Sequence, residues 1–144
     1  SHILIEFRPD ATADQKKAAK DRANEILSEV SKGKRSFEEY VALYTDDVLS
    51  KKTGGDVGWQ TALTLVPAYY QAVLAMKPNE IKGLVETQYG FHIIKKIGQR
   101  PYAEANKRTV REAVFVEKRR VIFDAYFAQL KKQYPVKINK DKIK

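Results

Sequence analysis

The stretch Thr53-Gly-Gly-Asp-Val-Gly-Trp59, together with Gln88-Tyr-Gly-Phe-His-Ile-Ile94, decides how this chain is organised. Three glycines within five residues, followed by the single tryptophan, predict a tight turn that other groups approach closely. The second stretch places His92 on an alternating apolar run, and the only other histidine, His2, lies on the first such run. We expect the two histidines to meet from separate strands, beside the glycine turn.

The composition indicates a soluble globular protein, with one domain of ordinary size or a domain with an appendage. Its 144 residues are 43% hydrophobic, which is enough to bury a real core. No apolar run approaches the roughly 18 residues that a membrane-spanning helix needs, so we expect no membrane span. The chain has no cysteine, which excludes disulfides and thiolate chemistry, and a metal site would need the two histidines together with carboxylates.

The net charge of +9 is concentrated in the last third of the chain. Residues 1–99 hold 14 Lys and Arg against 13 Asp and Glu, whereas residues 100–144 hold 13 against 5. This change at Arg100-Pro101 predicts a domain over 1–99 and a separate basic segment over 100–144. Because the basic residues fall around the whole circumference of an expected helix, we predict a solvated surface and no nucleic-acid partner.

The amino-terminal strand is expected over residues 2–8, which are apolar and rich in β-branched side chains. Alternation gives it one face that carries His2 and Glu6, and an opposite apolar face with Ile3 and Ile5. Two capping boxes follow, and they predict helices. The segment Thr12-Ala-Asp-Gln15 opens a helix that ends at Gly33, and Ser36-Phe-Glu-Glu39 opens a shorter one that runs to Tyr44.

The middle of the chain alternates between loop, strand and helix signals. Residues 45–52 are polar and are expected to form a loop, and the glycine stretch after them is expected to form a short strand. Val66-Pro67 starts a third helix, and residues 81–87 and 90–97 predict two further strands joined by a short turn. The element order predicts an α+β fold in which helices cover a small sheet.

A single long helix is expected from Tyr102 to Tyr134, because this segment has no glycine or proline. Its apolar residues do not share one face, so we predict that a second copy of the chain, or a segment outside this sequence, covers it. Pro135 is expected to end the helix, and Val136-Lys-Ile138 is expected to add a short edge strand.

Six motifs, in this order and spacing, resemble parvulin-type peptidyl-prolyl isomerases over residues 1 to about 98. They are Ser1-His-Ile-Leu4, Ser36-Phe-Glu-Glu39, Thr45-Asp-Asp47, Gly54-Gly-Asp-Val-Gly-Trp59, Val66-Pro67 and Gly90-Phe-His-Ile-Ile94. The resemblance is to the bacterial extracytoplasmic members of the SurA or PrsA kind, in which a long helix follows the domain. It implies a four-stranded antiparallel sheet surrounded by helices, isomerisation of X-Pro bonds without metal or cofactor, and unfolded or proline-containing polypeptides as clients.

The resemblance also implies the site residues. The paired histidines become His2 and His92, and the acidic position between them becomes Asp47, or Asp46 if the register slips by one. The implied catalytic residues are His2, Asp47, Thr87 and His92, and the implied substrate-binding residues are Val57, Trp59, Leu65, Tyr69 and Phe91. From the residues alone, Trp59 and Tyr69 fit a pocket or a core equally well. Two positions depart from the family, since Leu65 stands where methionine is usual and Tyr69 where phenylalanine is usual.

Two functional hypotheses follow from these residues. The first is an isomerase that does not depend on phosphate, because Glu6 lies on the histidine face where phosphate-dependent relatives carry a basic cluster. The second is a parvulin-fold chaperone without catalysis, which binds clients through the proline pocket and the long helix. We also expect a homodimer through that helix and a location in the bacterial periplasm or cell envelope, with any targeting segment outside these residues.

Overall fold

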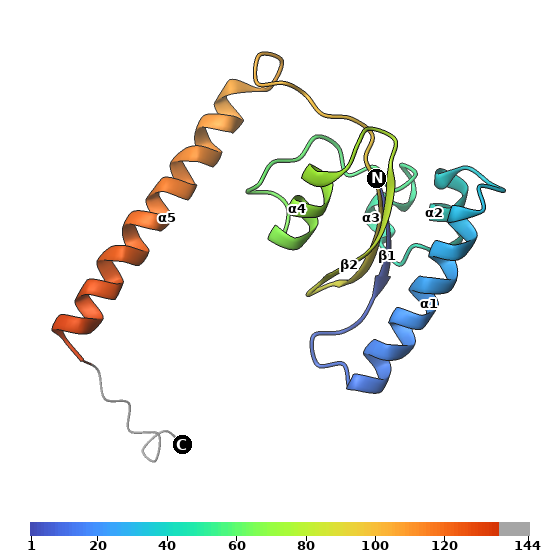
Figure 1. Ribbon diagram of the computed structural model, residues 1–144, viewed down its shortest axis with the longest axis horizontal. Coiled ribbons are helices and arrows are strands. Elements are labelled where there is room, and N and C mark those ends of the chain that lie inside the picture. Colours follow the sequence, from blue (N-terminus) through green and yellow to red (C-terminus); the bar gives the residue numbers. More distant parts are fainter. Residues whose placement is uncertain (136–144) are drawn as a thin grey trace. The chain divides into compact units, whose positions relative to one another are not determined.

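The computed structural model describes residues 1–135, which form two compact units, Ser1–Pro101 and a second that begins at Tyr102. The expected strand at Val136–Ile138 lies outside the described residues. Figure 1 shows the elements of both units. In chain order they are β1 (His2–Glu6), α1 (Ala13–Ser31), α2 (Phe37–Tyr44), α3 (Val48–Lys51), α4 (Pro67–Ala75), β2 (Ile81–Thr87), β3 (Gly90–Lys95) and α5 (Lys107–Gln133).

The sheet of the first unit has three antiparallel strands in the order β1-β3-β2, which confirms the α+β architecture. The expected fourth strand is absent from residues 1–135, because the glycine stretch turns instead of extending. Gly54, Gly55 and Gly58 all have positive φ angles, between 67° and 78°, which a strand does not allow. The loop nevertheless docks on the edge of β1, where the His2 amide donates a hydrogen bond to the Gly55 carbonyl at 2.9 Å.

The two faces of the sheet are covered by different helices. On one face, α1 and α2 pack against β1 and β3 around a fully buried centre that includes Ile3, Ile5 and Ile93. On the other face, α4 packs against β2 (Figure 1), and its Tyr69 joins Ile94 of β3 in a smaller cluster. The hydrophobic cluster on the α4 face is therefore smaller than the one on the α1 and α2 face.

The capping boxes set the helix starts as predicted. The Thr12 hydroxyl accepts from the Gln15 amide before α1, and the Ser36 hydroxyl accepts from the Glu39 amide before α2. The prediction of a loop over residues 45–52 was wrong in part. Asp47 caps the one-turn helix α3 through its bond to the Leu49 amide, and a single capped turn leaves no apolar periodicity that a sequence could reveal.

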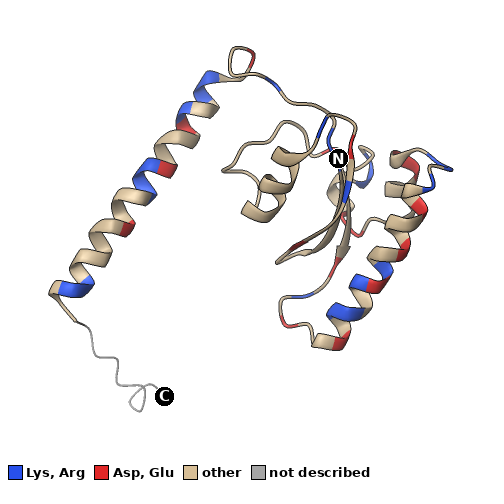
Figure 2. Cartoon of the chain, viewed as in Figure 1, with Lys and Arg blue, Asp and Glu red and all other residues tan. Residues whose placement is uncertain are grey.

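The second unit contains α5, which begins later than expected. Asn106 is its N-cap and its side chain accepts from the amides of Arg108 and Thr109, so residues 102–105 form a turn before the helix. Figure 2 shows Lys and Arg along its length, with fewer Asp and Glu between them. None of its residues is buried, and its exposed apolar side chains include Phe115, Ile122, Phe123, Tyr126 and Phe127. No described helix is both long enough and apolar enough to cross a membrane.

Candidate active site

The two histidines meet on the sheet face that α4 covers. In the antiparallel register, His2 of β1 pairs with Ile94 and Leu4 pairs with His92 of β3, so the histidines are diagonal neighbours on one face. Their Nδ1 atoms lie 3.1 Å apart, and the rings are nearly parallel at 20°. Both side chains are buried, and the expected meeting of the two histidines is therefore confirmed.

Asp47 anchors one end of this pair. Its Oδ2 lies 2.9 Å from His2 Nε2, and its Oδ1 accepts from the Leu49 amide at 3.0 Å. The neighbouring acid points elsewhere, because Asp46 forms an ion pair with Arg22. The alternative register, in which Asp46 would face the histidines, does not occur in this structure.

Thr87 lies at the other end of the pair, where its hydroxyl is 2.8 Å from His92 Nε2. A carboxylate only accepts hydrogen bonds, so His2 must donate to Asp47 through Nε2–H, and its Nδ1 must then accept from Nδ1–H of His92. His92 Nε2 is left to accept from the Thr87 hydroxyl, whose oxygen in turn accepts from the Tyr89 amide at 3.2 Å. The five groups form one hydrogen-bond chain with a single direction, which ends at Asp47.

Ser50 is a member of this site that the sequence did not reveal. Its buried hydroxyl donates to Asp47 Oδ2 and also lies 3.3 Å from His2 Nε2. The available signal was its position three residues after Asp47, which places both side chains on the first turn of a helix. Ser50 and the Leu49 amide therefore hold the two different oxygens of the Asp47 carboxylate.

The electrostatics keep both rings neutral and the acid ionised. Burial acts to raise the pKa of Asp47, but hydrogen bonds from Ser50, His2 and the Leu49 amide outweigh burial and hold the pKa at about 2. Burial lowers the pKa of His92 to about 4, with a further contribution from His2. Burial also lowers the pKa of His2, although Asp47 partly offsets that effect. At neutral pH the pair is therefore a neutral hydrogen-bonded unit.

A cavity of about 200 Å³ opens beside the pair. The ring of Tyr69 stands edge-on to both histidines, with centroid distances of 5.8 Å to His2 and 5.2 Å to His92. The lining is mostly apolar, and its residues are His2, Val57, Thr64, Leu65, Val66, Tyr69, Tyr89 and His92. A larger hollow of about 580 Å³ includes Thr87 but neither histidine, so the smaller cavity is the one that the pair can act on.

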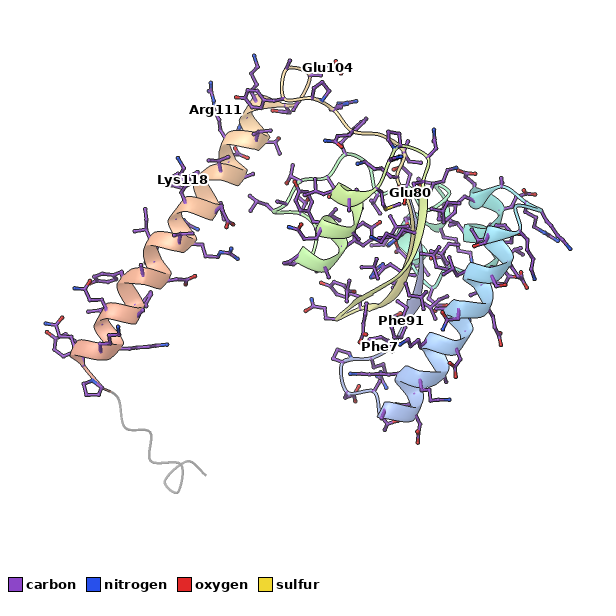
Figure 3. The ribbon with its side chains drawn as sticks, in the orientation of Figure 1. Phe7, Glu80, Phe91, Glu104, Arg111 and Lys118 are labelled. Atoms are coloured by element: carbon purple, nitrogen blue, oxygen red, sulfur yellow. The ribbon has the colours of Figure 1, made fainter. Side chains whose placement is uncertain are left out.

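The structure brings most of the expected substrate-binding residues to this cavity, but not all of them. Val57, Leu65 and Tyr69 line it, whereas Trp59 is 58% exposed and stacks on the Arg100 guanidinium at 3.9 Å. Phe91 packs against Phe7 in the core on the α1 side of the sheet (Figure 3). Because neighbouring residues on a strand face opposite ways, Phe91 cannot share the face of His92. Neither Trp59 nor Phe91 therefore lines this cavity, contrary to what we expected from the sequence.

Thr64, Val66 and Tyr89 complete the lining, and sequence reasoning missed them. Thr64 and Val66 flank the expected Leu65 in a loop whose path no periodicity defines. Tyr89 lies in the short turn between β2 and β3, next to Thr87. Its turn position was recognisable, but the direction of its side chain toward the cavity was not.

The burial of neutral His92 predicts a pH-dependent stability. An unfolded histidine titrates near pH 6.5, whereas the pKa of folded His92 is about 4. The stabilisation is therefore complete above about pH 6.5 and is lost as the pH falls toward 4, because the unfolded chain binds the proton first. We expect a loss on the order of 2–3 kcal/mol in the free energy of unfolding.

Denaturant unfolding at pH 7 and pH 4.5 measures this loss, with His92→Gln as the control because it removes the titration. The difference between the two proteins isolates His92 from carboxylates that titrate in the same range. The prediction fails if the wild type and His92→Gln lose stability equally over this pH range.

Comparison with protein families matches residues 2–98 to the model described as "Rotamase: PPIC-type PPIASE domain". Among curated proteins, the chain is 32% identical over 136 residues to Chaperone SurA of Nitrosospira multiformis, covering 90% of this chain and 29% of that protein. It is 36% identical over 107 residues to Foldase protein PrsA 1 of Bacillus cereus, covering 72% of this chain and 33% of that protein. The chain thus spans about a third or less of these relatives.

Solved structures give a consistent result. A PpiC-type peptidyl-prolyl cis-trans isomerase domain aligns with a TM-score of 0.61 at 27% identity, covering 69% of this chain and 87% of that one. The peptidylprolyl isomerase PrsA from Bacillus anthracis aligns with a TM-score of 0.63 at 29% identity, covering 97% of this chain and 60% of that one. The second alignment extends over most of the chain, whereas the first covers about two thirds of it.

Proposed function

The chain belongs to the PPIC-type peptidyl-prolyl isomerase (rotamase) family, and from that premise we propose that it isomerises X-Pro bonds in unfolded or partly folded polypeptide clients. The observation that carries the proposal is the apolar cavity of about 200 Å³, one wall of which is the hydrogen-bonded pair of His2 and His92. Its apolar lining suits a proline ring, and the neutral pair lies beside the place where the amide before that ring would be.

The reaction requires no bond cleavage. Rotation about an X-Pro amide meets a barrier of about 18–20 kcal/mol, and a thousandfold acceleration requires about 4 kcal/mol of preference for the twisted amide. A dry cavity that holds the proline ring, with a few fixed polar groups around it, can supply a preference of that size. In this proposal the hydrogen-bond chain from Thr87 to Asp47 fixes the cavity wall and does not transfer a proton to the substrate.

We propose further that the activity does not depend on phosphate before the proline. Glu6 belongs to the same face of β1 as His2, and Asp46 lies close by because its Oδ2 accepts from the Glu6 amide at 3.0 Å. Because Arg22 pairs with Asp46, the Glu6 carboxylate is the charge that disfavours a phosphate dianion at this end of β1. Peptides with phosphoserine before proline should therefore be no better substrates than peptides with alanine at that position.

Removal of part of the cavity wall tests the isomerase proposal. We expect Leu65→Ala to lower kcat/KM on proline peptides by about tenfold, because the proline ring loses apolar contact area. Leu43→Ala is the matched control, since Leu43 is an exposed leucine of α2 that does not line the cavity. A wild-type protein that accelerates no X-Pro peptide, measured by exchange NMR, would exclude the proposal.

A second candidate function is a chaperone that binds clients without catalysis, and the exposed apolar side chains of α5 favour it. Suppression of client aggregation by a protein without isomerase activity would support this candidate. Loss of that suppression after deletion of residues 102–144 would assign the client surface to the second unit. Similarity to Chaperone SurA and to Foldase protein PrsA 1 is consistent with both candidates.

We also propose a homodimer in which a second copy of the chain covers α5, because this helix buries none of its residues. Sedimentation analysis of the whole chain should give a dimer, and a strictly monomeric profile would contradict it. Similarity to SurA and PrsA proteins supports an extracytoplasmic location in the cell envelope as part of the same proposal. Cell fractionation of the natural protein tests that location.

A further inference from the structure

Most polar side-chain atoms around the cavity are already committed to protein partners. All four ring nitrogens of His2 and His92 take part in the chain between Asp47 and Thr87. The Thr64 hydroxyl donates to the Thr61 carbonyl at 3.1 Å. None of these groups has a hydrogen left to offer a substrate, so the histidine pair cannot by itself donate a hydrogen bond to a bound amide.

Two tyrosine hydroxyls of the cavity lining, those of Tyr69 and Tyr89, differ from these groups. Neither has a hydrogen-bond partner among residues 1–135. Tyr89 is 54% exposed, and its hydroxyl can remain in contact with water. Tyr69 differs, because its side chain is only 4% exposed and its ring packs with Met76, Val85 and Ile94.

The Tyr69 hydroxyl is accessible even though its ring is buried. Every fully enclosed side-chain oxygen or nitrogen among the described residues has a hydrogen-bond partner, so the Tyr69 hydroxyl, which has none among them, is not completely enclosed by protein atoms. Tyr69 lines the cavity, and its ring is fixed edge-on to both histidines. The side chain is therefore a rigid donor with little surrounding water, which is the arrangement that makes a hydrogen bond effective in a transition state.

Resting on the proposed isomerase activity, we propose that Tyr69 is a catalytic residue, whose hydroxyl donates a hydrogen bond to the proline nitrogen of the twisted X-Pro amide. In the planar amide the nitrogen lone pair is delocalised into the carbonyl and accepts poorly. Rotation localises that lone pair, so the bond to Tyr69 strengthens only as the amide twists. An interaction of this kind raises kcat and leaves ground-state binding unchanged.

The hydroxyl keeps its proton throughout the useful pH range. Burial raises the pKa of Tyr69 well above its usual value, and the charge of Asp47 acts in the same direction. Tyr69 is thus a donor at neutral and at alkaline pH, and its contribution should not vary between pH 6 and pH 9.

The substitution Tyr69→Phe tests the proposal, because it removes one oxygen and preserves the ring that fills the cavity wall. We expect kcat on a proline peptide to fall by about five- to tenfold. The dissociation constant of the same peptide, measured by NMR titration, should change by less than about twofold. Tyr70→Phe is the matched control, since Tyr70 is the next residue of α4 and does not line the cavity.

Each outcome either supports or overturns the assignment. Full activity in Tyr69→Phe overturns it, and so does a loss found in Tyr89→Phe with none in Tyr69→Phe. Weaker peptide binding with kcat unchanged also overturns it, because the hydroxyl would then serve ground-state binding. An unfolded Tyr69→Phe protein would contradict the premise that this hydroxyl has no partner in the described part of the chain. Wild-type protein without activity would instead defeat the proposed function itself.

Discussion

Asp47→Asn is expected to reverse the hydrogen-bond chain through the histidines and to lower isomerase activity by about 10- to 100-fold. The Leu49 amide donates to Oδ1 of Asp47, so an asparagine at this position keeps its oxygen there and turns its NH₂ group toward His2. His2 Nε2 would then have to accept. His2 would carry its proton on Nδ1, and His92 would carry its proton on Nε2.

The reversal has a direct spectroscopic signature. Nitrogen-15 NMR of the two rings should show His2 Nε2–H and His92 Nδ1–H in the wild type, and the opposite tautomers in Asp47→Asn. The fold should be retained, because asparagine is as good an N-cap as aspartate for α3. Activity should fall, because the carboxylate charge disappears and the Thr87 end of the chain changes from donor to acceptor.

Asp46→Asn is the matched control for this experiment. Asp46 is the preceding acid, pairs with Arg22 and contacts neither histidine. Its substitution should leave both tautomers as in the wild type and reduce activity by less than about twofold. Unchanged tautomers in Asp47→Asn would refute the directed chain inferred from the distances.

Gly90→Ala is expected to lower the free energy of unfolding by about 3–5 kcal/mol, the largest stability effect predicted for this chain. Gly90 opens β3 with φ at +146°, a conformation that residues with a side chain rarely adopt. A Cβ atom at this position would lie 2.2 Å from the Ile5 carbonyl oxygen and 2.9 Å from the Glu6 Cα. Both contacts are backbone atoms of β1, so the pairing that holds His2 beside His92 would have to shift.

Gly33→Ala separates the cost of backbone conformation from the cost of this contact. Gly33 also has a positive φ, +63°, but a Cβ atom there would meet nothing within 4 Å. We expect it to cost about 1 kcal/mol. Urea unfolding of both variants checks the difference, and equal losses would mean that the contact with β1 does not decide the stability of Gly90→Ala.

Local signals predicted the elements that depend on nearby residues. The capping boxes at Thr12 and Ser36 appear in the structure because each is closed by a residue only three positions away. The prediction of a strand at the glycine stretch was wrong, because its glycines have positive φ angles and form a loop. This loop docks on His2 of β1, which lies about 50 residues away in the sequence. Such a partner leaves no local periodicity.

The site residues also separate into those that the sequence predicted and those that only the structure revealed. The resemblance named His2, Asp47, Thr87 and His92, and the structure joins these four into one chain of hydrogen bonds. Ser50 was missed because its role depends on the one-turn helix after Asp47. Trp59 and Phe91 do not line the cavity, because nearness in sequence to the glycines or to His92 does not fix the direction of a side chain.

By itself, the sequence determined the α+β class, the alternating faces of β1 and β3 and the pair of histidines, since these follow from periodicity and residue type. Only the tertiary structure decided that the hydrogen-bond chain runs toward Asp47 and that the Tyr69 hydroxyl has no hydrogen-bond partner among residues 1–135. Both depend on distances between elements far apart in the chain. The Asp47 carboxylate sets the direction of the hydrogen bonds, because it can only accept. Its position beside His2 exists only once β1, α3 and β3 are packed together, so the sequence alone does not reveal it.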